Sequence, residues 1–150
     1  MSEYLVFCDS SGKYNFRDLR RMIKFIDEGN LIIGERAIFK EEIYRELMRV
    51  ILNLMVSILF KVRIRDIDSP FRVIKRIKMI EINNYKKVES NLFNLENTLI
   101  YTKLMRENVK RVRIGYTKRT NGKSRGIPPG RLIKVIYGAL LTLKYYWKYR

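Results

Sequence analysis

The chain of 150 residues contains no histidine, a single cysteine and three prolines. Zinc sites built on histidine and nucleophile triads that depend on histidine are therefore excluded. Because Cys8 has no second cysteine to pair with, no disulfide forms within the chain, and an extracellular fold held by disulfides is not expected. Acidic residues are also few, with 15 Asp and Glu against 32 Lys and Arg, so the formal net charge is +17.

Long hydrophobic runs are missing as well. The uncharged stretches Val50–Phe60 and Val135–Leu143 fall short of the roughly 20 residues that a helix needs to cross a bilayer. The start of the chain shows no basic segment followed by an apolar one, so no signal peptide is expected. With 47% hydrophobic residues, the chain is nevertheless expected to bury the core of one domain.

The positive charge is concentrated in the last third of the chain. Residues 101–150 hold 14 Lys and Arg but only one acid, Glu107. A solvated basic surface, a nucleic-acid-binding patch and an anionic membrane contact all predict such a bias, so the charge alone favours none of them.

The first 36 residues predict a strand, a helix and a second strand. The apolar run Tyr4–Cys8 is followed by a turn, Asn15 can cap the helix, and residues 31–33 form the second apolar run. Short joints between such elements indicate a parallel crossover, which places Asp9 and Arg36 at the same end of a sheet. The remaining patterns predict helices at 40–60, 94–107 and 131–150 and strands at 62–65 and 112–116, with residues 73–93 giving no clear pattern.

Residues 66–72 read Asp-Ile-Asp-Ser-Pro-Phe-Arg, and Arg119-Thr-Asn-Gly-Lys-Ser124 opens a later loop. Together with Asp9-Ser-Ser11 after the first strand and Arg36 after the second, this order resembles the family 2 glycosyltransferases. The branch it is most similar to moves a sugar from a nucleotide onto a polyprenyl phosphate. The resemblance covers about residues 4–130 and rests on several weak motifs in the right order.

The resemblance implies roles for two acids. Asp9 matches the first acid of a motif that holds Mg²⁺ or Mn²⁺ against a nucleotide diphosphate, with Ser11 replacing the second acid. Asp66 matches the acid taken as catalytic or site-organising, which only needs to position groups when the acceptor is an ionised phosphate. From the residues themselves, Asp9 can equally bond backbone N–H groups of a turn, and Asp66 can pair with Arg63 or Arg65.

The resemblance also implies a set of phosphate- and substrate-binding residues. Several of them are arginines, whose guanidinium groups suit phosphate oxygens because they offer paired donors. A solvated helix face with Glu–Arg pairs is the alternative for Arg45 and Arg49, and a solvated basic loop is the alternative for the segment Arg119–Ser124. Pro70 and Arg49 stand where the family has glycine and serine. The expected set is Arg36, Arg45, Arg49, Ser69, Arg72, Glu96, Arg119, Lys123 and Ser124.

The expected fold is α/β: a partial GT-A-like (Rossmann-like) mixed sheet flanked by helices over residues 1–130, followed by a C-terminal amphipathic helix, 131–150. The family's first strand-helix-strand unit, which holds the nucleotide base, has no counterpart before Tyr4. A degenerate enzyme, one half of an enzyme completed by a separate chain, or the product of a truncated reading frame is therefore expected, with little activity alone.

The last helix predicts a contact with an anionic membrane surface, because a basic arc accompanies a broad apolar face. Its expected membrane-contact residues are Arg131, Lys134, Lys144, Trp147 and Lys148. The expected location is cytoplasmic, at the inner membrane face. Aromatic residues among lysines also suit nucleic acid, so a non-catalytic basic binding protein is the alternative, and a structural subunit that completes its sheet with another chain is a third.

Overall fold

The computed structural model describes residues 2–10, 12–37, 43–87, 92–117 and 132–150. These residues form an α/β fold around a four-stranded mixed sheet in the order β1-β3-β2-β4. The strands are β1 (Tyr4–Phe7), β2 (Leu31–Arg36), β3 (Arg72–Lys75) and β4 (Lys110–Ile114). The helices are α1 (Arg17–Ile23), α2 (Ile43–Phe60), α3 (Arg76–Tyr85), α4 (Phe93–Leu99) and α5 (Leu132–Tyr146), with a π-helical turn at Ile100–Leu104 and a 3₁₀ turn at Trp147–Tyr149.

Strands β1, β2 and β4 run in one direction, and β3 lies antiparallel between β1 and β2. The prediction that the first two strands run parallel and end at the same side of the sheet is confirmed, although they are not hydrogen-bonded neighbours. β2 is buried from Leu31 to Glu35 because strands lie on both of its edges and helices on both of its faces.

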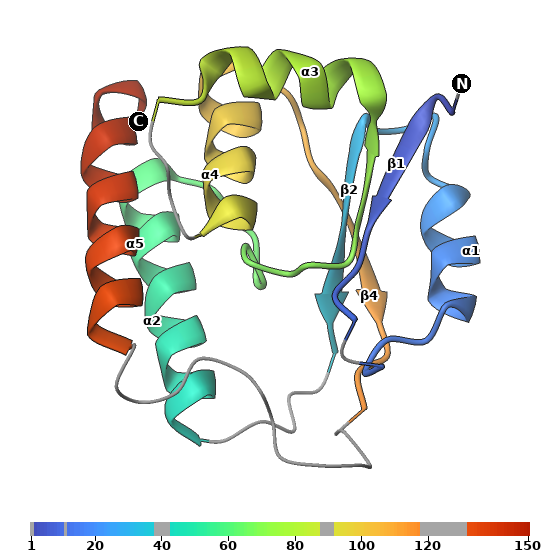
Figure 1. The fold of residues 1–150 in the computed structure, drawn as a ribbon, viewed down its shortest axis with the longest axis horizontal. Helices are drawn as coiled ribbons and strands as arrows, with labels where there is room; N and C mark the ends of the chain where they lie inside the picture. Colours follow the sequence, from blue (N-terminus) through green and yellow to red (C-terminus); the bar gives the residue numbers. More distant parts are fainter. Residues whose placement is uncertain (1, 11, 38–42, 88–91, 118–131) are drawn as a thin grey trace.

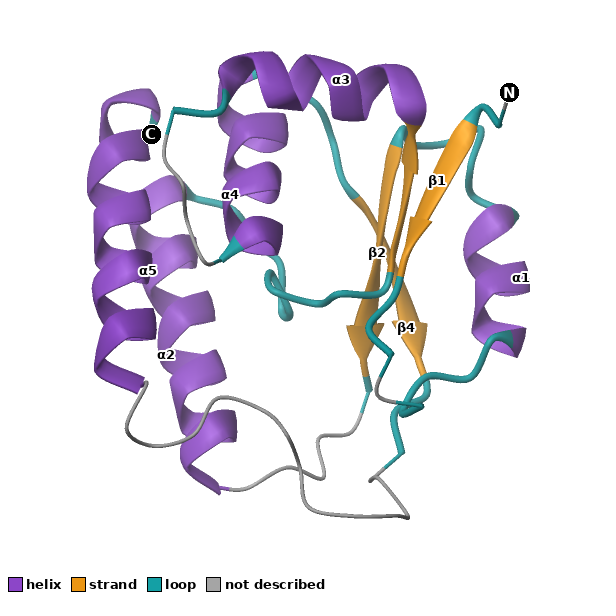
Figure 2. Ribbon diagram, viewed as in Figure 1, coloured by secondary structure: helices purple, strands orange, loops and turns teal. Residues whose placement is uncertain are grey.

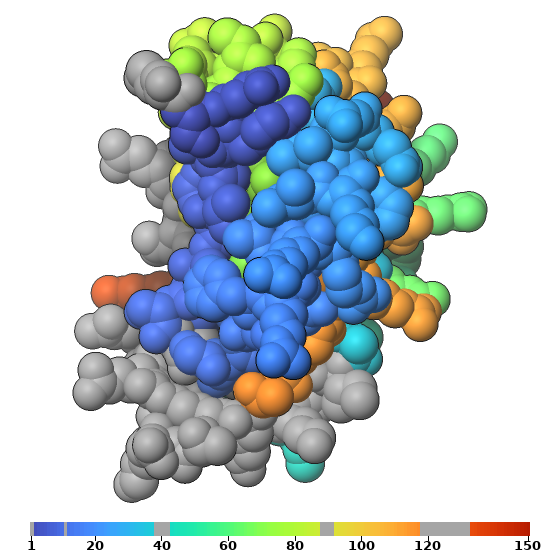
Figure 3. Space-filling view, turned by 90° about the vertical axis from the view of Figure 1, so that its right-hand side faces the viewer, coloured from blue at the N-terminus to red at the C-terminus, as the bar shows by residue number. Residues whose placement is uncertain are grey.

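The helices divide unequally between the two faces of the sheet (Figures 1 and 2). α1 alone covers one face, where Met22 packs with Ile32 and Val73. Figure 3 shows that side, with β1 and α1 forming much of the surface. The other face carries the larger core, in which α3 and α4 pack on the sheet and α2 and α5 form an outer layer.

Two sequence predictions need correction. Residues 62–65 are not a strand: Val62 and Ile64 are buried, which produces the alternating pattern, but the Arg65 N–H donates to the side chain of Glu35 instead of to a strand. The third strand is β3, which begins with the charged Arg72 and is therefore invisible to an apolar pattern. The predicted helices at 40–60, 94–107 and 131–150 correspond to α2, to α4 with its π-helical turn, and to α5.

Candidate functional site at the carboxyl ends of the strands

Three of the residues expected from the sequence lie at the end of the sheet where β1, β2 and β4 finish. Asp9 follows β1, Arg36 is the last residue of β2, and Asp66 lies in the turn that precedes β3. The turn is held against β2 at Gly34, whose N–H donates to the Phe71 carbonyl and whose carbonyl accepts from the Ser69 hydroxyl at 2.6 Å. A side chain at position 34 would meet Ile114 Cδ1 at 2.8 Å, so glycine permits this close approach.

Arg36 and Asp66 form a two-pronged ion pair at the centre of the site. Arg36 Nε donates to Asp66 Oδ2 at 2.6 Å and Nη2 donates to Oδ1 at 2.7 Å. The side chains are only 15% and 1% exposed. Burial opposes the charge of Arg36, but the hydrogen bonds and the negative charge of Asp66 outweigh it, so the pKa of Arg36 is raised. The pairing partner of Asp66 is thus across the site, rather than Arg63 or Arg65 nearby.

Tyr14 lies beside this ion pair, and sequence analysis did not single it out. Its ring packs on Phe71 and Tyr116, and the Arg36 guanidinium lies 5.3 Å from the centre of the Tyr116 ring. The Tyr14 hydroxyl is buried with no hydrogen-bond partner among the described residues. Burial raises the pKa of Tyr14, Arg36 lowers it, and the charges of Asp9 and Asp66 raise it further.

A second arginine approaches the site from α2. Arg49 Nη1 donates to the Arg65 carbonyl at 3.1 Å, and burial lowers its pKa, as the nearby charge of Arg36 also does, while Asp66 acts in the opposite sense. Arg49 also pairs with Glu46 of the same helix, with 3.9 Å between its Nη2 and the Glu46 Oε1. Arg45 lies one turn earlier in α2, where its Nε donates to the Tyr44 hydroxyl.

Ser69 and Arg72, which were expected to bind substrate, have their polar groups engaged within the fold. Ser69 is fully buried and tied to β2, as described above. Arg72 is 3% exposed, and its guanidinium donates to the carbonyls of Ile67, Ser69 and Asn94 and to the hydroxyl of Thr98. These residues hold the 66–71 turn from inside and so help to position Asp66.

Asp68 lies on the same turn as Asp66. In the sequence it is part of the 66–72 motif, but no role was predicted for it. Burial raises its pKa to about 6, while Arg72 acts to lower the pKa and Asp66 to raise it.

Glu96 also has an internal role. It is 2% exposed, and its carboxylate accepts from the Tyr146 hydroxyl at 2.9 Å, which joins α4 to α5. The Glu96 carboxylate, which was expected to contact a substrate, is therefore buried between two helices and bonded to one of them.

Several expected residues lie outside the described part of the chain, namely Arg119, Lys123, Ser124 and Arg131. Of the other residues expected at a membrane, Lys134, Lys144 and Lys148 are exposed and Trp147 is 39% exposed, with its ring edge-to-face against Phe60 of α2. In the segments that the structure describes, no group of three or more potential metal-ligating side chains occurs.

No family model matches this chain, and no curated protein is similar to it at a significant level.

Proposed function

We propose that this chain is a glycosyltransferase-like domain that transfers a sugar from a nucleotide-sugar to a polyprenyl phosphate or glycan acceptor. The observation that supports the proposal is that Asp9, Arg36 and Asp66 lie at one end of the sheet, where Arg36 and Asp66 form a buried ion pair. The three residues come from separate segments of the chain. Accidental matches would be expected to scatter over the fold.

The reaction is a displacement at the anomeric carbon of the sugar. An oxygen of the acceptor phosphate attacks that carbon, a new C–O bond forms, and the C–O bond to the diphosphate breaks with its electron pair leaving on the nucleoside diphosphate. Because an acceptor phosphate is already ionised, no proton has to be removed. Asp66, engaged by Arg36, would position the guanidinium, and Arg36 and Arg49 would stabilise the charge on the leaving diphosphate.

A divalent metal fits this site in part. Asp66 already faces Arg36, and the described residues offer Asp9 as the candidate ligand. Asp9 would therefore hold Mg²⁺ or Mn²⁺ together with phosphate oxygens of the donor, and the ion would neutralise part of the diphosphate charge.

The test is a transfer assay with a panel of UDP- and GDP-sugars, Mg²⁺ or Mn²⁺, and vesicles that contain polyprenyl phosphate. Because little activity is expected of the chain alone, only a low yield of labelled sugar is expected in the lipid extract, equal for the wild-type chain and for Arg20→Gln, an exposed arginine of α1. Asp66→Asn is expected to abolish the product. If no donor gives lipid-linked sugar and no nucleoside diphosphate shifts the unfolding midpoint of the chain, the proposal is wrong.

Nucleic-acid binding is a second candidate function, and the exposed face of α1 is the observation that favours it. Arg17, Arg20, Arg21 and Lys24 are all exposed there. Such a row of cations can follow a phosphate backbone. A mobility-shift assay with duplex DNA and RNA, comparing the wild-type chain with an Arg17→Gln/Arg20→Gln variant, tests it: equal binding by both would exclude α1 as the contact.

A further inference from the structure

The outer helix α2 has two apolar faces, and the core covers only one of them. Val56 and Phe60 face inward and are at most 1% exposed. On the opposite side an aliphatic stripe is open to solvent, with exposures of 87% at Ile43, 57% at Leu47 and Leu54, and 66% at Ile58. Val50 and Ile51 complete the stripe at 47% and 41%. At 100° per residue these side chains fall within an arc of about 100°, along about 22 Å of helix.

Helix α5 repeats the same spacing 90 positions later. Ile133, Tyr137, Leu140 and Leu141 are exposed by 41–78% and occupy the positions that correspond to Ile43, Leu47, Val50 and Ile51. The next two corresponding positions are Lys144 and Lys148, both exposed. The exposed face of α5 is therefore apolar in its first half and basic in its second.

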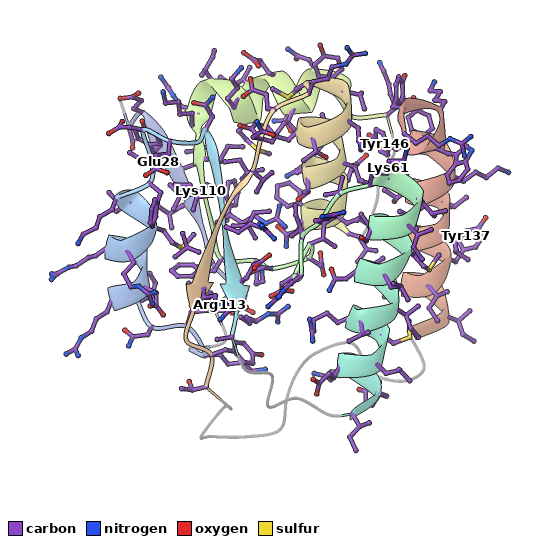
Figure 4. The ribbon with its side chains drawn as sticks, turned by 180° about the vertical axis from the view of Figure 1, so that it is seen from behind. Glu28, Lys61, Lys110, Arg113, Tyr137 and Tyr146 are labelled. Carbon is purple, nitrogen blue, oxygen red and sulfur yellow. The ribbon has the colours of Figure 1, made fainter. Side chains whose placement is uncertain are left out.

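The two faces belong to one layer of the molecule. Figures 1 and 4 show α2 and α5 side by side at the side of the fold opposite α1, and Figure 4 shows Tyr137 directed away from the protein. The ring of Phe60 lies edge-to-face against Trp147 with 6.4 Å between ring centres, so the carboxyl ends of the two helices meet. The colours of Figure 1 show that the two helices run in the same direction. The apolar rows therefore lie level with each other. Lys61 follows the last residue of α2, Lys144 lies in the last turn of α5, and Lys148 lies in the 3₁₀ turn that follows α5.

We infer that this two-helix face, formed by the exposed residues of α2 and α5 named above, binds the surface of an anionic lipid bilayer. An apolar patch of this extent marks an interaction site in a stable protein. The lysines at its end, within a chain of net charge +17, are complementary to anionic headgroups, to which each basic residue adds attraction. Within the described segments no helix is long and apolar enough to span a bilayer, so the pair would lie flat in the interface.

The sequence predicted a membrane contact for the last helix alone, and α2 adds the longer and more apolar half of the two-helix face. The position of α2 also places this face near the proposed catalytic site. Arg49 lies on the side of α2 toward Asp66, while Leu47 and Val50 lie on the exposed side. The site is thus about one helix diameter, roughly 10 Å, from the proposed lipid surface.

Vesicle co-sedimentation tests the two-helix face with the full chain and with vesicles that lack polyprenyl phosphate, so its outcome is independent of transfer activity. Binding is expected to vesicles that contain phosphatidylglycerol and to be weak to neutral phosphatidylcholine. Leu47→Ser/Leu54→Ser is expected to reduce the partition coefficient about tenfold or more. Ile77→Ser on α3 is the matched control, because Ile77 is exposed by 57%, as Leu54 is.

The electrostatic part is tested by Lys144→Gln/Lys148→Gln, for which a loss of about fivefold per lysine is expected. Arg17→Gln/Arg20→Gln on α1, at the other side of the molecule, is expected to bind vesicles like the wild type. Circular dichroism confirms that each variant is folded. The inference is overturned if the leucine variant binds as the wild type does. It is also overturned if the wild-type chain sediments as a dimer that Leu47→Ser/Leu54→Ser converts to a monomer, or if it shifts nucleic acid and ignores anionic vesicles.

Discussion

Asp66 organises the candidate site through charge. Its carboxylate receives two hydrogen bonds from Arg36 while almost no solvent reaches it, and Arg49 adds a second cation nearby. A buried guanidinium is tolerated only when a partner compensates for lost hydration. Arg36 can therefore face a bound anion from a fixed position, since Asp66 holds its Nε and one Nη.

Asp66→Asn is expected to destabilise the fold by about 3–5 kcal/mol, because it leaves Arg36 buried without a counter-charge. Urea unfolding followed by circular dichroism measures the loss. The control is Glu28→Gln, which breaks the more exposed pair with Lys110 (Figure 4) and is expected to cost at most about 1 kcal/mol. A double replacement, Arg36→Met with Asp66→Leu, is expected to recover much of the stability. If the single variant is as stable as the control, the ion pair does not organise the site.

Asp68 gives the turn a dependence on pH. Its pKa is raised from 3.8 to about 6 by burial, with Asp66 adding to the rise and Arg72 and Arg36 opposing it. The folded chain therefore binds more protons than the unfolded chain between about pH 4 and 6, and the contribution of Asp68 to stability falls as pH rises through that window. Asp68→Asn is expected to match the wild type near pH 4 and to exceed it by on the order of 2 kcal/mol at pH 7. Urea unfolding at several pH values measures the difference, and a constant difference would contradict the burial of this carboxyl group.

The order of residues along the chain was sufficient to select Asp9, Arg36 and Asp66, but their partners depend on tertiary structure. The bond between Arg36 and Asp66 joins positions 30 residues apart, whereas local reasoning offered Arg63 and Arg65. Ser69, Arg72 and Glu96 have side chains that suit substrate binding, and only burial shows that the protein itself uses them. Tyr14 left no signal, since an aromatic ring beside a helix start is usually part of a core.

At the scale of elements, helix α5 is attached to the fold by one buried polar contact as well as by its apolar face. The hydroxyl of Tyr146, a fully buried residue, donates to the carboxylate of Glu96 in α4. Burial raises the pKa of Tyr146, and its hydrogen bond to Glu96 raises it further, so the hydroxyl keeps its proton and remains a donor.

Tyr146→Phe is expected to destabilise the fold by about 1–3 kcal/mol, because Glu96 then remains buried without this donor. Tyr137→Phe removes the same hydroxyl from the exposed side of α5 and is expected to change the stability by less than about 0.5 kcal/mol (Figure 4). Thermal or urea unfolding distinguishes the two. Equal stabilities would mean that the Glu96 carboxylate finds another donor.

Apolar periodicity identified the elements whose burial follows a simple pattern, which are α1, β2, α2 and α5. Apolar periodicity failed for segments that are buried without forming a strand ladder, and for strands that bury a charged residue. Val62 and Ile64 alternate with exposed arginines as strand residues do, yet their segment crosses over the core as a loop. β3 begins with Arg72, a charge that is stable inside the fold because four acceptors surround it. The exposure of the apolar stripe on α2 could not be predicted either. Periodicity shows that a helix face is apolar, but it does not show which face the core covers.

For the whole molecule, a net charge of +17 implies self-repulsion that opposes the compact state. Screening by salt shortens the range of this repulsion to about 10 Å at 0.1 M, so raising NaCl is expected to stabilise the chain. A ligand that binds the folded site adds stabilisation beyond screening, in proportion to RT ln(1 + [L]/Kd). The two effects separate when anions are compared at equal ionic strength.

Pyrophosphate at matched ionic strength is expected to stabilise the chain by about 1–3 kcal/mol more than chloride, because Arg36 and Arg49 offer guanidinium donors at one end of the sheet and the Tyr14 hydroxyl can donate to an oxygen there. Arg49→Gln and Tyr14→Phe are expected to reduce this excess, whereas Arg20→Gln, which removes the same charge from exposed α1, is expected to preserve it. The unfolding free energy in urea, measured in both salts for each variant, gives the excess directly. An excess of the same size in all four proteins would mean that pyrophosphate acts on the overall positive charge, and the convergence at the end of the sheet would then have no role in binding phosphate.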